Sequence, residues 1–153
     1  MKIRDFRKED APRASSLIVE CYQKLDVGGH TAIGLKIQIA GNSPENLLKR
    51  AGTINYFVAV DNDRVIGICG YDEEKIRTLF VDTKYQKLGI GSKLLETVLQ
   101  EAKKEGLKTV TTWSTILAEP FYSLAGFQRV GEIALPPGKR EIVLIEMVKT
   151  LGG

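Results

Sequence analysis

One stretch of the sequence constrains the fold more than any other: Leu79-Phe80-Val81-Asp82-Thr83-Lys84-Tyr85-Gln86-Lys87-Leu88-Gly89-Ile90-Gly91-Ser92-Lys93. Its first residues are typical of the end of a β-strand, and apolar residues recur at helical spacing from Ile90 onward. Two glycines, Gly89 and Gly91, stand where the loop meets this helix. Free backbone N–H groups and the positive end of a helix dipole attract anions at such a point. The loop is therefore predicted to bind a phosphate, although paired glycines also serve tight helix–strand packing.

Two common phosphate-binding motifs do not fit this stretch. A Walker A loop requires a glycine five residues before Gly-Lys-Ser/Thr, but position 86 is Gln86 and Gly91 is followed by Ser92-Lys93 in the reverse order. A dinucleotide fingerprint requires a third glycine where this chain has Leu94, in an early parallel βαβ unit. Neither a nucleoside-triphosphate loop nor a Rossmann fingerprint is indicated.

The pattern of the remaining chain predicts alternating strands and helices. Strands are expected at residues 2–6, 54–60, 65–71, 76–81, 109–114, 128–133 and 142–148, and helices from about residue 10 to 21, 43 to 50, 90 to 104 and 119 to 124. The three central strands follow one another closely and are expected to form an antiparallel meander. Residues 25–42 are rich in glycine and are expected to form a mobile loop.

Composition narrows the class of protein. The 153 residues are 43% hydrophobic and 27% charged, which is typical of one globular domain. A net charge of +3 is too small to indicate a nucleic-acid binder, and no apolar run reaches the length of a membrane span. The two cysteines are distant from each other and the first residues lack the apolar core of a signal peptide, so a cytoplasmic protein is expected. One histidine and two distant cysteines also argue against a metal site.

Two motifs together resemble one known family. Gln86-x-x-Gly89-x-Gly91, after a strand, resembles the acetyl-CoA signature Q/R-x-x-G-x-G/A of the GNAT family of N-acetyltransferases. Pro120-Phe121-Tyr122-Ser123-Leu124-Ala125-Gly126-Phe127 is similar to the family's A-x-x-F-Y-x-x-x-G-F block, with Ala118 four residues before the tyrosine. The motifs stand in the family's order, and the resemblance extends over the whole chain.

The resemblance implies a fold and an activity. The fold class would be α/β, with a mixed, mostly antiparallel central sheet flanked by helices, in a single domain over residues 1–153. The activity would be transfer of acetyl from acetyl-CoA directly to a primary amine, with no metal. Acetyl-CoA and an amine acceptor are the expected partners, and a homodimer is left open. Residues 25–42 and 132–140 would border the acceptor, whose identity the sequence does not give.

The resemblance also implies roles for particular residues. The pantetheine arm would bond to the backbone of the strand before the loop, and the pyrophosphate to the backbone N–H groups of the loop. The implied acetyl-CoA-binding residues are Leu79, Phe80, Val81, Gln86, Lys87, Leu88, Gly89, Ile90, Gly91, Ser92 and Thr115. Thr115 stands where many relatives have an asparagine that contacts the cofactor. Tyr122 would be the acid that protonates the departing thiolate.

The general base is less clearly marked. Relatives often carry an acidic base on the fourth strand, whereas here the nearest acids precede that strand; Glu74 is the closest of them and is the predicted base, acting through water. His30, in the expected loop, is the alternative. The absence of an acid on the strand motivates a second hypothesis, a CoA-binding regulatory module with impaired catalysis. Trp113 is interpreted as a core residue.

Overall fold

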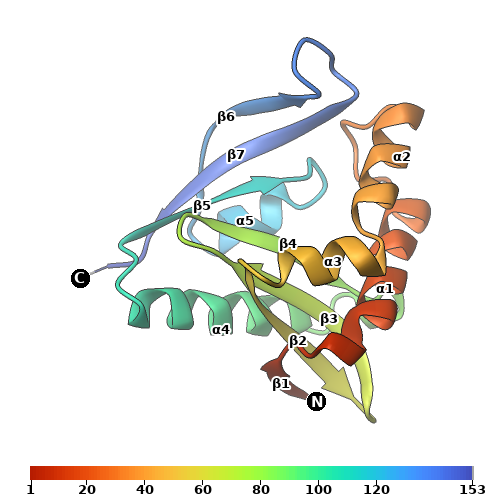
Figure 1. Ribbon diagram of the computed structural model, residues 1–153. Coiled ribbons are helices and arrows are strands. Elements are labelled where there is room, and N and C mark those ends of the chain that lie inside the picture. Colours follow the sequence, from red (N-terminus) through yellow and green to blue (C-terminus); the bar gives the residue numbers. More distant parts are fainter. Residues whose placement is uncertain (153) are drawn as a thin grey trace.

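The computed structural model describes residues 1–152, which form one mixed sheet with helices on both faces (Figure 1). Within them the sheet has 7 strands in the order β1-β2-β3-β4-β5-β7-β6, and only the β4–β5 pair is parallel. The expected mixed, mostly antiparallel sheet is confirmed. The elements are β1 Lys2–Asp5, η1 Lys8–Asp10, α1 Ala11–Lys24, α2 Ala32–Gly41, α3 Pro44–Arg50, β2 Asn55–Asp61, β3 Arg64–Tyr71, β4 Lys75–Val81, η2 Thr83–Tyr85, α4 Ile90–Lys104, β5 Thr109–Ser114, α5 Glu119–Leu124, β6 Gln128–Leu135 and β7 Ile142–Thr150.

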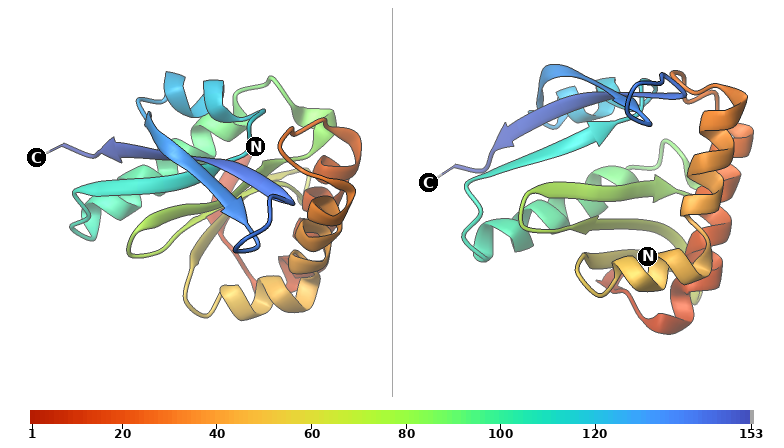
Figure 2. Two further views of the ribbon diagram at one scale, coloured as in Figure 1. Left: turned by 90° about the horizontal axis from the view of Figure 1, so that it is seen from above. Right: turned by 45° about the horizontal axis from the view of Figure 1, so that its top comes forward.

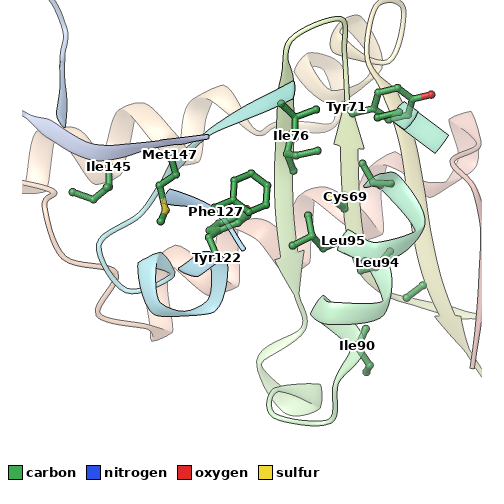
Figure 3. Packing of buried hydrophobic residues seen from close by; sticks show 14 of the residues in the cluster. Cys69, Tyr71, Ile76, Ile90, Leu94, Leu95, Tyr122, Phe127, Ile145 and Met147 are labelled. Carbon is green, nitrogen blue, oxygen red and sulfur yellow. The ribbon is translucent and has the colours of Figure 1, made fainter. Parts of the chain in front are cut away.

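Two apolar clusters attach the helices to opposite faces of the sheet. On one face, α4 places Leu94 and Leu95 against strand residues such as Cys69, and this cluster extends to Tyr122 and Phe127 (Figure 3). On the other face, α1 and α3 pack on β2, β3 and β4. The helices α1, α2 and α3 lie together on the side of the molecule away from the C-terminus (Figure 2). In both α1 and α4, apolar residues spaced three and four positions apart form the face that packs on the sheet.

The sheet opens between β4 and β5. The two strands pair only at Lys75–Thr111 and Ile76–Thr112, and from Arg77 onward β4 has no partner on that side among the described residues. The register of β3 with β4 also shifts here, and Thr78 has a positive φ of 56°. Because strand pairing ends, backbone groups of β4 after Ile76 are left free to bond to a ligand.

The expectation of a mobile loop over residues 25–42 is wrong, because residues 32–41 form α2. The Thr31 hydroxyl accepts a hydrogen bond from the Gly34 N–H at 3.0 Å and caps the helix. The Thr31 N–H in turn donates to the Glu141 carbonyl at 2.9 Å, far along the chain. Glycines weaken a helical pattern in the sequence, and here a long-range contact fixes the start of the helix instead.

The helix α2 lies very close to the chain before β7 at Gly34. A Cβ atom at this position would overlap the carbonyl oxygen of Glu141. We expect Gly34→Ala to lower the free energy of unfolding by about 1–3 kcal/mol, because the helix must shift. Gly41→Ala, in the same helix with open space around its Cβ, is the matched control and should be neutral or slightly stabilising. Equal stabilities in urea denaturation would contradict this packing.

Candidate active site

A cavity of about 570 Å³ occupies the opening between β4 and β5. Its walls come from α1, the end of α3, β4, the loop before α4, β5 and α5. Of the residues predicted to bind acetyl-CoA or protonate the thiolate, the lining includes Leu79, Phe80, Val81, Gln86, Lys87, Gly89, Ile90, Gly91, Ser92, Thr115 and Tyr122. Leu88 does not line the cavity, and its side chain is 67% exposed. The two sequence motifs, about 30 residues apart in the chain, therefore meet at one site.

The loop before α4 presents free backbone donors to this cavity. None of the N–H groups of residues 87–92 donates a hydrogen bond to another described residue, and the first helical bond runs from the Lys93 N–H to the Gly89 carbonyl at 3.1 Å. Positive φ angles at Lys87 (64°) and Gly89 (81°) curl the loop. The Gln86 side chain fixes the loop to β4 by donating to the Val81 carbonyl at 2.7 Å. Such a cradle fits a phosphate group.

The free edge of β4 lies beside this cradle. Asp82 donates its N–H to Ile66 at 2.8 Å, on the β3 side, and backbone groups of alternate residues point to opposite neighbours. Leu79 and Val81 therefore direct their backbone groups toward the opening. The Val81 carbonyl already accepts bonds from Gln86 and from the Cys21 thiol at 3.2 Å. Leu79 is the residue whose backbone best suits a ligand along this edge.

Tyr122 closes the cavity from α5. It is 6% exposed, and its ring packs edge-on against Phe121 and Phe127 with centroids 5.3 Å apart in each pair. Burial raises the pKa of its phenol above the ordinary value, so the group carries its proton at neutral pH. The Thr115 hydroxyl accepts a hydrogen bond from the Ala118 N–H at 3.2 Å and so helps to fix the start of α5.

Comparison with known proteins identifies the family. Residues 34–151 match the family model described as an acetyltransferase (GNAT) domain, which is more than half of the chain. The protein belongs to the GNAT acetyltransferase family. The resemblance seen in the sequence motifs is thereby confirmed.

Individual GNAT relatives are distant. An uncharacterized N-acetyltransferase, YafP of Escherichia coli, is 32% identical over 74 residues, which are 48% of this chain and 46% of that protein; the chain spans about half the length of this relative. A GCN5-related N-acetyltransferase from Rhodopseudomonas palustris superposes with a TM-score of 0.89 at 16% identity, covering 97% of this chain and 94% of that one. The PaiA N-acetyltransferase of Thermoplasma acidophilum, in complex with coenzyme A, superposes with a TM-score of 0.79 at 19% identity, covering 97% of this chain and 98% of that one. These structures share the GNAT fold.

Neither residue predicted as a base for the GNAT reaction lines the cavity. Glu74 lies exposed in the turn before β4, where its carbonyl accepts the Thr111 N–H at 2.9 Å. His30 is half-buried, with its Nδ1 2.7 Å from the Gly28 carbonyl oxygen and its ring 5.8 Å from that of Tyr22. The structure thus brings Tyr122 together with the acetyl-CoA motif but not with Glu74 or His30.

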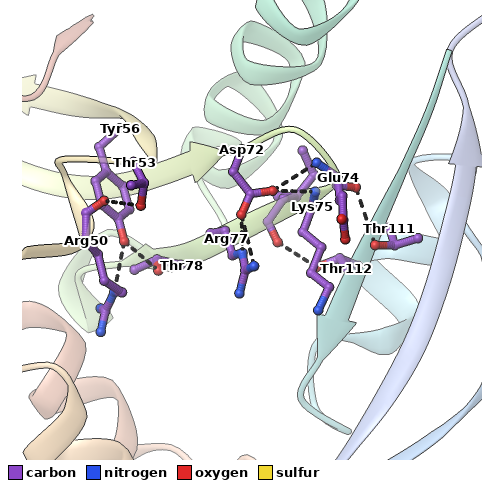
Figure 4. A network of polar contacts seen from close by, with 11 residues as sticks. Arg50, Thr53, Tyr56, Asp72, Glu74, Lys75, Arg77, Thr78, Thr111 and Thr112 are labelled. Atoms are coloured by element: carbon purple, nitrogen blue, oxygen red, sulfur yellow. Dashed lines mark hydrogen bonds and ion pairs between the residues drawn. The ribbon is translucent and has the colours of Figure 1, made fainter. Parts of the chain in front are cut away.

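Several cavity residues were not found by sequence reasoning. Arg50 ends α3, while Lys75 and Arg77 stand at the start of β4, and all line the cavity (Figure 4). The interpretation of Trp113 as a core residue is wrong: its half-buried ring lines the cavity, and the Lys75 ammonium lies 3.3 Å from its centroid. No local motif marks these positions, because the residues meet only when α3, β4 and β5 assemble.

Within residues 1–152, no group of three or more histidine, cysteine or acidic side chains is arranged to hold a metal ion. The helices of these residues include none with the length and apolar character needed to cross a membrane.

Proposed function

We propose that this GNAT protein is an enzyme that transfers the acetyl group of acetyl-CoA directly to a primary amine, within a single domain. The observation that carries the proposal is the free backbone N–H groups of residues 87–92, which share one cavity with the unpaired edge of β4 and with Tyr122. A phosphate cradle, an extended backbone edge and a protonated acid are the parts that this transfer requires.

Each part has a separate task. The neutral amine attacks the thioester carbonyl of acetyl-CoA, and the new N–C bond forms before the C–S bond breaks. The nitrogen then releases one proton to solvent, which replaces the proton that the acid gives to the sulfur. The loop of residues 87–92 holds the pyrophosphate by its N–H groups, and the β4 edge at Leu79 holds the arm and donates to the developing oxyanion. The Tyr122 phenol gives its proton to the departing sulfur. Thr115 supports this arrangement by capping the segment that carries Tyr122.

The proposal is tested by measuring release of free coenzyme A. The protein is mixed with acetyl-CoA and a panel of amines that includes amino acids, amino-acid amides, phosphorylated amines, polyamines and lysine peptides. We expect release of coenzyme A to depend on the amine, and mass spectrometry to find an acetylated product. Tight binding of acetyl-CoA with no release from any acceptor would instead favour the regulatory CoA-binding module.

The pH dependence of turnover distinguishes the candidate bases. Sequence reasoning predicts that Glu74→Gln lowers turnover more than His30→Ala, yet neither residue lines the cavity. If the enzyme selects the neutral acceptor, the limb of kcat/KM follows the pKa of the acceptor amine. We expect the pH at which kcat/KM levels off to rise by about 2 units between a peptide or amino-acid amide with a free α-amine and a lysine-type acceptor, whose unperturbed pKa values are about 8 and 10.4.

A residue acting as base gives a different result. The limb would then stay fixed when the acceptor is changed. Its loss in Glu74→Gln would identify Glu74 as the base, and its loss in His30→Ala would identify His30.

A further inference from the structure

Three cationic side chains, those of Arg50, Lys75 and Arg77, line the cavity on one side of β4, with Arg77 between the other two (Figure 4). The cradle joins the end of β4 near Val81, whereas Lys75 and Arg77 precede Val81 by about 20 Å and about 13 Å of extended chain. Arg50 reaches the same face of β4 from the end of α3, and Figure 4 shows all three head groups on one side of the strand. With the acyl donor running from the cradle along the β4 edge, these cations lie on the acceptor's side.

Arg50 is held in place by neutral groups only. Its guanidinium donates to the Tyr56 hydroxyl at 3.2 Å, the Gly41 carbonyl at 2.6 Å and the Asn42 side-chain oxygen at 2.6 Å. No carboxylate within residues 1–152 forms an ion pair with it. Since a guanidinium has five N–H donors, one on each terminal nitrogen is left for a ligand. The bonds to Gly41, Asn42 and Tyr56 pre-orient this half-buried fork.

The neighbouring cations are only partly neutralised. Asp72 binds Arg77 at 2.9 Å, but Lys75 lies over the Trp113 ring without an ion pair in the described chain. Burial lowers the pKa of Lys75, and the charge of Arg77 adds to this effect. Glu146, bonded to the Trp113 indole N–H at 3.2 Å, and the exposed Glu74 are the other acids nearby. The cavity lining itself contains neither Asp nor Glu among residues 1–152.

An uncompensated positive charge in a half-buried cavity is costly unless a ligand supplies the counter-charge. A planar guanidinium with two free N–H groups matches a carboxylate or a phosphate, which accept such bonds in pairs. The same charges repel polyamines and other polycationic acceptors. These charges also disfavour the ammonium form of an acceptor amine. The amine therefore loses its proton more easily in this cavity, which has no carboxylate base of its own.

We propose that the acceptor carries an anionic group, a carboxylate or a phosphate, close to its amine, and that Arg50 binds this group with Lys75 and Arg77 adding positive charge. The inference rests on the proposed acetyl transfer and names the acceptor's chemical class. It places the anion beside the end of α3 and the amine between Arg77 and the β4 edge at Leu79. The acceptor is thus expected to be zwitterionic in solution, while the amine reacts in its neutral form.

The first test compares acceptors with and without the anion, and kcat/KM is referred to the concentration of neutral amine because the anion also raises the pKa of the amine. Amino acids are paired with their amides, and O-phosphoethanolamine with ethanolamine, so the two arms separate carboxylate from phosphate recognition. We expect kcat/KM to be at least about tenfold higher for the anionic member of the preferred pair, the effect of one charge-assisted hydrogen bond. Amides, ethanolamine or polyamines that react equally well or better would overturn the inference while leaving acetyl transfer in place.

Variants of Arg50 then locate the effect. Arg50→Gln should raise KM for the anionic acceptor about tenfold or more and leave KM for acetyl-CoA unchanged, whereas Arg50→Lys should retain part of the affinity because it keeps the charge. Arg64→Gln, an exposed arginine at the β2–β3 turn outside the cavity, is the matched control. Should loss of the Arg50 bonds unfold the protein, Arg77→Gln provides the second variant, with a smaller increase in the same KM.

A binding experiment keeps the inference testable without turnover. Inorganic phosphate and acetate are titrated into the coenzyme A-saturated protein, and NMR signals of the arginine side-chain N–H groups and of the Trp113 indole are followed. Saturable shifts that are lost in Arg50→Gln and kept in Arg64→Gln would support the anion site. Unmoved signals at both anions would overturn it, whether or not any amine releases coenzyme A. Failure of acetyl transfer alone would leave these shifts intact.

Discussion

Replacing Tyr122 with phenylalanine is expected to lower kcat about 10²–10⁴-fold, the usual contribution of a positioned general acid. The variant deletes only the phenolic O–H, and the aromatic packing against Phe121 and Phe127 is retained. Because the proton transfer occurs only as the sulfur departs, the affinity for acetyl-CoA should be unchanged. Steady-state kinetics with the best acceptor, together with calorimetric titration of acetyl-CoA, measure both quantities.

Tyr71→Phe is the matched control for this change. Tyr71 is also buried, but its hydroxyl donates to Glu105 at 2.7 Å, and it does not line the cavity. The Tyr71→Phe variant should be somewhat less stable than the unmodified protein and should keep its turnover number. A Tyr122→Phe enzyme that turns over at the rate of the unmodified protein would show that water or the acceptor supplies the proton.

Replacing Gly89 with valine is expected to weaken acetyl-CoA binding about 10–100-fold, the equivalent of one charge-assisted hydrogen bond lost from the cradle. Gly89 lines the cavity, and its φ of 81° is one that a β-branched residue rarely adopts. No protein atom lies within 4 Å of a Cβ placed there, so the added side chain occupies space next to the free N–H groups. Calorimetric titration of acetyl-CoA gives the change in affinity.

The backbone strain of this variant needs its own control. Gly106, just beyond the other end of α4, has a φ of 94° and equally open space around its Cβ, but lies outside the cavity. Gly106→Val should lose a similar amount of stability, about 1–2 kcal/mol, and bind acetyl-CoA normally. Unchanged affinity in a folded Gly89→Val protein would remove the phosphate-cradle assignment.

Much of the fold was predictable because its signals are local. The helix α4 repeats apolar residues every three or four positions, and the strands β2, β3 and β4 follow one another with turn residues between them. The two GNAT motifs are also continuous in the sequence. The free N–H groups of the first motif depend only on where a helix begins. Tyr122 is recognised from the residues around it in the second motif.

The same reasoning failed where distant contacts outweigh local preference. The helix α2 contains glycine and has no clear apolar stripe, and it is fixed by the bond from Thr31 to Glu141. Trp113 has a large apolar side chain of the kind typical of a protein core. It faces the cavity instead because β4 and β5 stop pairing after Ile76. Residue type gives propensity, whereas the end of strand pairing decides which side chains become cavity walls.

The sequence by itself determined the family and indicated the proposed phosphate cradle and the candidate acid, because each resides in a short continuous segment. Only the tertiary structure brings together the cations of the proposed acceptor end. Arg50 and Lys75 are 25 positions apart in the chain and lie on one face only after α3 packs beside the sheet. An electrostatic field is a sum over groups close in space, and spacing in the sequence does not reveal which charges are neutralised by neighbours.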